Sequence, residues 1–308
     1  MQVGSLQIHP ILDGVFRTPA REMLRYVGPA DDPWSSHKAF ITADGMIELA
    51  LGGFLLHVAD RVVVIDCGLG PTRTSEGMEG GLFLDSLAAL GVRQDDVTDV
   101  LFTHLHFDHV GWATQKGRIV FPNATYRCHR ADWAHFVDDP EGGAARKLLP
   151  LVDRMEFWER DDTILPGLDV QGAPGHTPGS TIMVVSDGGK RAMLLGDVVH
   201  CPLELVEDDW QAVFDVDPVL AQHTREAVAR ELEGTDVPIA AAHFPGLQFG
   251  RLLRTGNRRS GQGFNDSDGH RSVGTTLGEQ AGRAGRAGAR HRHLDVKRAR
   301  PSVGRCDR

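Results

Sequence analysis

Residues Thr103–Gly111, T-H-L-H-F-D-H-V-G, constrain this chain more than any other stretch. Four potential metal ligands lie within six positions: His104, His106, Asp108 and His109. The apolar residues directly before them predict the end of a buried strand. In an extended chain, residues two apart point the same way, so His104 and His106 can hold one ion together, and the following turn presents the other two ligands to a neighbouring position. Packing gives no reason for this cluster, whereas neutral imidazole and carboxylate are good ligands for divalent metals.

Three more potential ligands follow apolar segments of the same kind. His176 lies in A-P-G-H-T-P-G-S, where glycine and proline shape a tight loop after a predicted strand. Asp197 follows A-M-L-L-G, and His243 follows P-I-A-A-A. A single histidine after a strand is more often structural. Ligand-type residues at the ends of four separate apolar segments, however, predict a metal centre, because a solvated polar turn would not explain the downstream residues.

Taken in order, these motifs resemble those of the metallo-β-lactamase superfamily of binuclear hydrolases. They are H-x-H-x-D-H, G-H-T-P-G, L-G-D and a final histidine at a strand end. The resemblance extends over Gln2–Leu253 and implies an α/β fold, a four-layer αββα sandwich with the metals in a cleft at one edge of the two sheets. It assigns His104, His106 and His176 to one metal, Asp108, His109 and His243 to the other, and Asp197 to a bridging position.

The residues around Asp197 resemble one branch of the superfamily. True β-lactamases are similar to this chain elsewhere but generally lack a bridging aspartate at this place. The segments G-D-V-V-H, which contains His200, F-D-V-D-P and A-A-H-F-P-G most resemble the lactonase and methyl parathion hydrolase branch. Glyoxalase II typically has a pair of glycines after its metal motif, whereas Gly111 is followed here by Trp112. The resemblance therefore implies a lactonase-like hydrolase.

The implied reaction is hydrolysis of a lactone or carboxylic ester by a hydroxide that bridges two divalent ions. Phosphotriester and thioester hydrolysis on the same fold are alternatives, as is a nucleic-acid-processing metallohydrolase. Zinc is the expected metal, and iron, manganese or cobalt stay open because no thiolate is among the ligands. We expect Asp108 to hold the nucleophile and relay its proton. We expect His200 either to assist catalysis as a hydrogen-bond or proton donor, or only to orient Asp197.

Charge divides the chain into an acidic part and a basic part. Residues 1–250 carry 19 Lys and Arg against 37 Asp and Glu, and residues 251–308 carry 14 against 5. An acidic body is a poor partner for nucleic acid or an anionic membrane, so we expect a small-molecule ester or lactone as substrate. We predict a hydrolase domain over residues 1–253 and a basic Gly/Arg-rich tail over residues 254–308. The composition of the tail predicts disorder, and nucleic-acid binding by the tail or an out-of-frame origin are the alternatives.

The remaining composition favours an enzyme of the cytoplasm. The chain has 308 residues, enough for one large domain. The sequence contains no run of about 18 apolar residues, so no membrane helix is predicted. No signal peptide is recognisable. The four cysteines form no C-x-x-C pair and are expected to be free thiols. We expect Cys201 to be a small buried residue, although its neighbour His200 could bring it close to the site, and we leave a homodimer open.

Periodicity gives a coarse order of elements. Strands are predicted at 6–12, 47–58, 61–66, 97–103, 119–129, 168–173, 181–185 and 191–195, and helices at 82–90, 130–137, 143–155 and 218–233. Asp217 is the expected N-cap of the last helix. The stretch Asp13–Gly45 is long for a connection, and is interpreted as a lid or pocket wall over the metals, a dimer contact or a peripheral wrap. Trp112 is expected either to line the pocket or to lie in the core.

Overall fold

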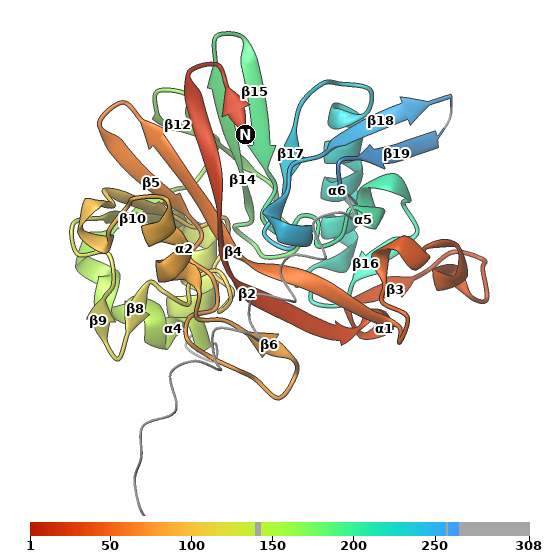
Figure 1. The fold of residues 1–308 in the computed structure, drawn as a ribbon, viewed down its shortest axis with the longest axis horizontal. Coiled ribbons are helices and arrows are strands. Elements are labelled where there is room, and N and C mark those ends of the chain that lie inside the picture. Colours follow the sequence, from red (N-terminus) through yellow and green to blue (C-terminus); the bar gives the residue numbers. More distant parts are fainter. Residues whose placement is uncertain (139–142, 257, 265–308) are drawn as a thin grey trace, which may run out of the picture. The chain divides into compact units, whose positions relative to one another are not determined.

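The computed structural model describes residues 1–138, 143–256 and 258–264, with two β-sheets at its centre (Figure 1). Within these residues, the first sheet has the strand order β1 (Gln2–Val3), β2 (Leu6–Pro19), β4 (Met46–Val58), β5 (Arg61–Ile65), β7 (Asp99–Leu101), β10 (Thr125–His129) and β11 (Met155–Trp158), with β6 (Met78–Glu79) beside β2. The second sheet has the order β12 (Asp162–Leu165), β13 (Leu168–Gly172), β14 (Thr181–Asp187), β15 (Lys190–Leu194) and β17 (Ile239–Ala240). Separate pairs are β3 (Leu24–Tyr26) with β16 (Trp210–Ala212), β8 (Thr114–Gln115) with β9 (Arg118–Ile119), and β18 (Arg251–Thr255) with β19 (Arg258–Gln262).

Helices cover the outer face of each sheet (Figure 1). The α-helices are α1 (Ala20–Met23), α2 (Phe83–Ala89), α3 (Arg130–Trp133), α4 (Gly143–Leu148), α5 (Leu203–Val206) and α6 (Pro218–Leu232). Shorter 3₁₀ turns lie at Pro33–Ser36, Lys38–Phe40, Gln94–Asp96, Leu149–Arg154 and Pro245–Leu247, and a π-helical turn lies at Ala134–Asp138. Phe83 of α2 is buried in one cluster with Val64 of the first sheet, and Val228 of α6 is buried in another with Met193 of the second. The fold is therefore the predicted four-layer αββα sandwich.

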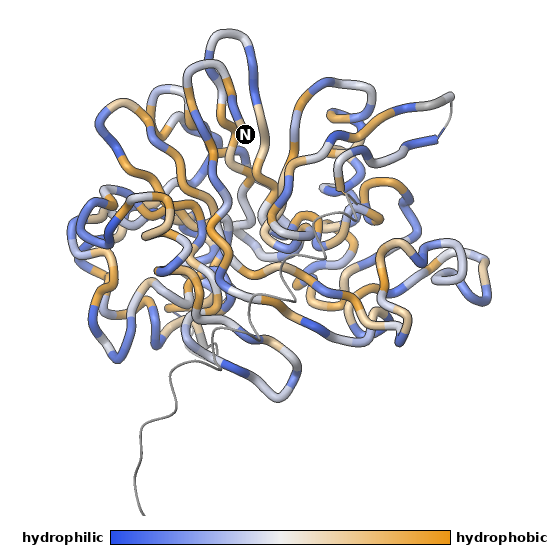
Figure 2. The backbone as a smooth tube through the Cα atoms, in the orientation of Figure 1, coloured by the Kyte–Doolittle hydropathy of each residue, from blue (hydrophilic) through white to orange (hydrophobic). Residues whose placement is uncertain are grey.

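Strand β5 shows why the central strands are apolar on both faces. Val64 belongs to the buried cluster under α2, whereas Val63 and Ile65 pack between the sheets with Met183 of β14. Side chains alternate between the two faces of a strand, so burial of both faces requires a continuous apolar run. Figure 2 shows this hydrophobic colouring along the strands at the centre of the fold.

Most predicted elements occur at the expected places. The hairpin predicted at 47–66 is confirmed, because β4 and β5 pair antiparallel. The last predicted helix is α6, whose N-cap Asp217 accepts a hydrogen bond from the backbone N–H of Leu220 at 3.0 Å. Gly234 follows with a φ of 72°, the left-handed conformation that glycine adopts readily after a helix.

The predicted helix at residues 143–155 is wrong in its second half. The α-helix α4 ends at Leu148, a 3₁₀ turn follows at Leu149–Arg154, and Met155 begins β11. Pro150 explains why the α-helix stops, because proline has no amide hydrogen and its ring clashes with the preceding turn. The residues after the turn instead add β11 to the first sheet, in parallel with β10.

The stretch Asp13–Gly45 is not one long connection. β2 continues to Pro19, and α1 and β3 follow it directly. β3 pairs with β16, and the ring of Trp34 packs on that of Trp210 with centroids 4.5 Å apart. Trp210 is fully buried by these contacts. These contacts give the stretch a small core of its own, as expected of a peripheral wrap.

The compact body extends beyond residue 253. The β18–β19 hairpin crosses the predicted boundary at 253/254, and Phe264 packs on Phe244 with ring centroids 5.1 Å apart. The described residues up to Phe264 therefore belong to the compact body. The β18–β19 hairpin is rich in arginine and glycine and shows no strand periodicity, which is why the sequence predicted it as part of the tail. The rest of the predicted tail, with its expected disorder, lies outside the described residues, and no helix within the described residues is long and apolar enough to cross a membrane.

Candidate metal centre

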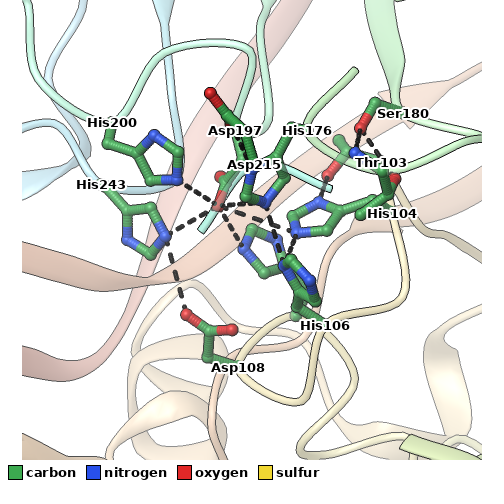
Figure 3. A network of polar contacts seen from close by, with 12 residues as sticks. Thr103, His104, His106, Asp108, His176, Ser180, Asp197, His200, Asp215 and His243 are labelled. Carbon is green, nitrogen blue, oxygen red and sulfur yellow. Dashed lines mark hydrogen bonds and ion pairs between the residues drawn. The ribbon is translucent and has the colours of Figure 1, made fainter. Parts of the chain in front are cut away.

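The carboxyl ends of strands from both sheets bring the predicted ligands together. The loop after β7 carries the H-x-H-x-D-H motif. In the second sheet, β13 and β15 run the same way because both pair antiparallel with β14, and β17 is parallel to β15. His176, Asp197 and His243 follow these three strands, so they leave the sheet at one edge. Figure 3 shows the three side chains pointing toward His104, His106 and Asp108.

The carboxylate of Asp197 lies at the centre of the cluster (Figure 3). Its Oδ2 atom lies within 3.7 Å of a ring nitrogen of each histidine in a group of five, which come from four loops. The distances are 3.0 Å to His243, 3.4 Å to His109, 3.4 Å to His200, 3.6 Å to His176 and 3.7 Å to His104, in each case to Nε2. One oxygen atom among so many nitrogen ligands is the arrangement expected of a carboxylate between two metal positions.

The side chains fall into sets that could each hold one ion. In every set the ligand atoms lie within 4.8 Å of one another. Two sets are those that the sequence resemblance implies, and two others connect them through Asp197. The sets are His104, His106 and His176; Asp108, His109 and His243; His104, His109 and Asp197; and His176, Asp197 and His200.

Three histidines hold a fixed partner with the ring nitrogen that faces away from the cluster. His109 Nδ1 lies 2.9 Å from Asp66 Oδ2, and His176 Nδ1 lies 3.0 Å from Asp215 Oδ1. His243 Nδ1 lies 2.9 Å from the backbone carbonyl oxygen of residue 50. Contacts of this kind fix the orientation of the imidazole ring, so that Nε2 of each histidine points into the cluster.

Sequence reasoning did not identify Asp66 or Asp215 as parts of the site. Asp66 directly follows β5, and its carboxylate accepts hydrogen bonds from Thr103 N at 2.8 Å and Thr103 Oγ1 at 2.7 Å. A signal for it was available, since a carboxylate at the end of an apolar strand is also what identified Asp197. Asp215 gave no such signal, because it lies in an irregular segment between the exposed Phe214 and Val216.

Burial and charge set the protonation of the cluster. Burial drives the pKa of His104 well below its usual range and lowers that of His106 to about 3, so both rings are neutral at neutral pH, as a metal ligand must be. Burial acts in the same direction on His109, but the charges of Asp197 and Asp66 outweigh it and raise the pKa. Burial would raise the pKa of Asp197, yet the surrounding histidines hold it well below its usual range. The central carboxylate is therefore ionised.

The donor set fits divalent metal ions. His109 Nε2 and Asp197 Oδ1 are buried and have no hydrogen-bond partner among the described residues. His106 Nδ1 faces two other imidazole nitrogens, His104 Nε2 at 3.1 Å and His176 Nε2 at 2.9 Å. Lone pairs that converge in this way are stabilised by a cation between them. Imidazole and carboxylate donors without thiolate suit zinc and several other first-row metals.

Comparison with known proteins identifies the family. Residues 54–243 match the family described as the Metallo-beta-lactamase superfamily. The chain belongs to this superfamily. All seven predicted ligands lie inside the matched residues, from His104 to His243. The prediction that the protein is a metal-dependent hydrolase of this superfamily is confirmed at that level.

Relatives and solved structures of the superfamily extend the comparison. An N-acyl homoserine lactonase of Bacillus thuringiensis is 24% identical over 216 residues, which are 64% of this chain and 84% of the relative. The structure of AidC, a dizinc quorum-quenching lactonase, is similar with a TM-score of 0.75 at 23% identity, over 85% of this chain and 95% of AidC. The structure of the hydrolase AbOPH is similar with a TM-score of 0.73 at 25% identity, over 86% of this chain and 95% of AbOPH. These similarities confirm the fold, and two of the three similar proteins are lactonases.

Three further residues close to the metal motifs in sequence have structural roles. Trp112 is buried, and its Nε1 donates a hydrogen bond to Asp13 Oδ1 at 2.9 Å, so it belongs to the core and not to a pocket wall. Cys201 is a small buried residue, and burial raises the pKa of its thiol far from the nucleophilic range. Ser180 Oγ accepts a hydrogen bond from Thr177 N at 2.9 Å and shapes the loop before β14.

Proposed function

We propose that this protein is a binuclear metal-dependent hydrolase that opens a lactone or cleaves a carboxylic ester. One observation carries the proposal: nitrogen atoms of five histidines surround a single oxygen of Asp197, and the flanking ligands fall into two sets of three. The similarity to lactonases supports the choice of substrate class. The acidic charge of residues 1–250 supports a small molecule over nucleic acid as the substrate.

Two divalent ions are the proposed cofactors, and zinc is the proposed metal. His104, His106 and His176 would hold one ion, Asp108, His109 and His243 the other, and Asp197 both. Bound there, the ions would act as Lewis acids on the substrate oxygen and would lower the pKa of a bound water molecule to about 7. Iron, manganese and cobalt remain the alternatives because their ligand preferences overlap with those of zinc.

Asp108 is the proposed proton carrier of the reaction. Its Oδ2 lies 3.6 Å from His243 Nε2, and its side chain is the most exposed carboxylate of the cluster, at 10%. A carboxylate in this position can accept a hydrogen bond from an attacking water and later return the proton to the leaving oxygen. Phe107, the residue before it, is 44% exposed, so its apolar ring is available to pack against the apolar part of an ester.

His200 is proposed to orient Asp197 and to donate a hydrogen bond, but not a proton. Its Nε2 lies 3.4 Å from Asp197 Oδ2, and its ring stacks on that of His243 at 5.6 Å between centroids. Burial drives the pKa of His200 well below its usual range. The ring is therefore neutral at neutral pH and has no proton to give a leaving alkoxide, although its N–H can still stabilise developing negative charge.

We further propose a cytoplasmic location and a two-part chain. Cys67, Cys128 and Cys201 are free and buried, which supports the proposed location in the reducing cytoplasm. The chain consists in this proposal of a hydrolase domain followed by a basic tail, and the boundary lies after the β18–β19 hairpin instead of at 253/254.

A substrate panel tests the proposed function. Zinc-loaded protein is assayed at equal concentrations with acyl lactones, carboxylic esters, thioesters, a β-lactam, a phosphotriester and an RNA phosphodiester. We expect the highest kcat/KM with a lactone or a carboxylic ester, and loss of that activity in Asp108→Asn. A higher kcat/KM with the β-lactam, the phosphotriester or RNA than with every lactone and ester would overturn the proposal.

A further inference from the structure

A buried arginine on α6 lies behind the candidate metal centre. The side chain of Arg225 is 2% exposed, and those of its two carboxylate neighbours, Glu204 and Asp215, are 0% and 1% exposed. Removing an ion from water is costly unless it is paired and hydrogen-bonded. Three buried charges that bind no metal themselves therefore require a structural reason.

Arg225 contacts three separate segments. Its Nε donates a hydrogen bond to the carbonyl oxygen of Val198 at 2.9 Å, one residue after Asp197. Its Nη2 lies 3.2 Å from Asp215 Oδ2, and its Nε lies 3.3 Å from Glu204 Oε1. The planar guanidinium group suits this role, because it presents several N–H groups in a fixed geometry.

Both carboxylates transmit these contacts to the site. Asp215 uses its other oxygen, Oδ1, for His176 Nδ1 at 3.0 Å, and the two side chains lie together in Figure 3. Glu204 uses its other oxygen, Oε2, for the backbone N–H of His200 at 2.7 Å. One carboxylate, Asp215, thus lies between Arg225 and the predicted ligand His176. Another, Glu204, lies between Arg225 and the backbone of His200.

The other half of the cluster has a different support. His109 Nδ1 depends on Asp66, which Thr103 holds through its backbone N–H and its hydroxyl group. Within the residues that the structure describes, no hydrogen bond or ion pair joins Asp66 to Arg225 or to Asp215. The two supports also come from different sheets, since Asp66 follows β5 of the first sheet and Arg225 lies on the helix that covers the second.

We propose that the two metal positions are supported separately, by Asp66 at the position of His109 and by Arg225, acting through Asp215, at the position of His176. Arg225 is in this proposal a positioning residue that touches neither metal nor substrate. The inference rests on the proposed two-metal function. Removing the outer partner of a ligand histidine weakens metal binding by about 10- to 100-fold. Each support should therefore control one ion and leave the other tightly bound.

Zinc competition with a chromophoric chelator tests this proposal on the folded, full-length protein. The variants are Arg225→Met, Asp215→Asn, Asp66→Asn and the double variant Asp66→Asn/Asp215→Asn. The matched control is Arg230→Met, because Arg230 lies on the same helix with its side chain 66% exposed and, among the described residues, pairs with Glu226 at the surface. Asp215→Asn preserves the size of the side chain, so it keeps the test decisive if Arg225→Met does not fold. Thermal unfolding of each apoprotein verifies folding.

The double variant distinguishes the outcomes. We expect two tightly bound ions in the wild type and in Arg230→Met, and one in each of the other single variants, with the second ion bound about 10- to 100-fold more weakly. Both ions should be weakened in the double variant. One tight ion remaining in the double variant, or two in Asp215→Asn and Arg225→Met, would overturn separate support. Fewer than two ions in the wild type would instead refute the two-metal function itself.

Discussion

Asp13 is a buried hydrogen-bond acceptor in the first sheet, and its replacement should destabilise the folded protein. Its side chain is fully buried, and its carboxylate accepts hydrogen bonds from donors in three separate segments. Oδ2 accepts from Leu69 N at 2.8 Å and Gly70 N at 2.9 Å, and Oδ1 accepts from Gly81 N, Phe83 N and Trp112 Nε1, each at 2.9 Å. Trp112 directly follows the metal motif, so Asp13 joins that motif to β2 and α2.

The change Asp13→Asn converts one of the two oxygens into an NH₂ group that cannot accept. At best the amide oxygen keeps the three donors on Oδ1, and the two backbone donors on Oδ2 lose their acceptor. A hydrogen bond to a charged group contributes about 1.5–3 kcal/mol, so we expect the free energy of unfolding to fall by about 3–6 kcal/mol. That is a large part of the ~5–15 kcal/mol that stabilises a typical domain.

Equilibrium unfolding in urea, followed by tryptophan fluorescence, measures this change. The midpoint should fall without a change in slope, because the surface exposed on unfolding stays the same. Asp60→Asn is the control, since Asp60 lies exposed in the turn between β4 and β5 and should behave as the wild type. A decrease below about 1 kcal/mol for Asp13→Asn would refute the argument that buried acceptor capacity holds these segments together.

Three further predictions follow from other parts of the structure. Burial opposes ionisation of Asp99, but Arg61 and Arg127 outweigh it and lower the pKa of this carboxyl below 3.8. Ionised Asp99 therefore stabilises the fold above that pH, and this stabilisation is lost as the pH falls through the lowered pKa of the folded state. Urea unfolding of Asp99→Asn should therefore differ from the wild type most above about pH 5 and least in acid, and a constant difference would contradict this assignment. Deleting β19 and all residues after it should lower the melting temperature, whereas deletion from Asn265 onward should not; equal melting temperatures for the two deletions would show that the hairpin contributes nothing. His200→Gln should keep its metal content and lose part of kcat without a change in the pH profile, and loss of a basic limb from the profile would restore the proton-donor role.

The metal motif was predictable because its ligands are close in sequence and each follows an apolar strand. His104 and His106 need only the alternation of an extended chain to point at one ion. The outer supports could not be predicted in the same way, because they depend on which strands become neighbours. Asp66 reaches His109 only through the parallel pairing of β5 with β7, and Arg225 reaches Asp215 across an irregular segment.

The peripheral parts were less predictable for a related reason. Trp34 and Trp210 are 176 positions apart in sequence, and nothing in either local pattern indicates that β3 pairs with β16. Composition was also misleading at the C-terminal end of the body, where arginine and glycine dominate the β18–β19 hairpin. Its buried apolar side chains are Leu252 and, after β19, Phe264, and two such residues give no periodicity. Pro150, by contrast, was a visible signal for the end of α4.

Metal stoichiometry tests the central claim most directly. Protein purified without chelator and dialysed after zinc supplementation is analysed by inductively coupled plasma mass spectrometry, together with His176→Ala and Asp197→Ala. We predict about two zinc ions per wild-type chain, about one for His176→Ala because the set around His109 stays intact, and less than one for Asp197→Ala because both positions lose the ligand between them. A reproducible wild-type value of one ion or fewer, or two ions in Asp197→Ala, would contradict the proposal that Asp197 bridges a binuclear centre.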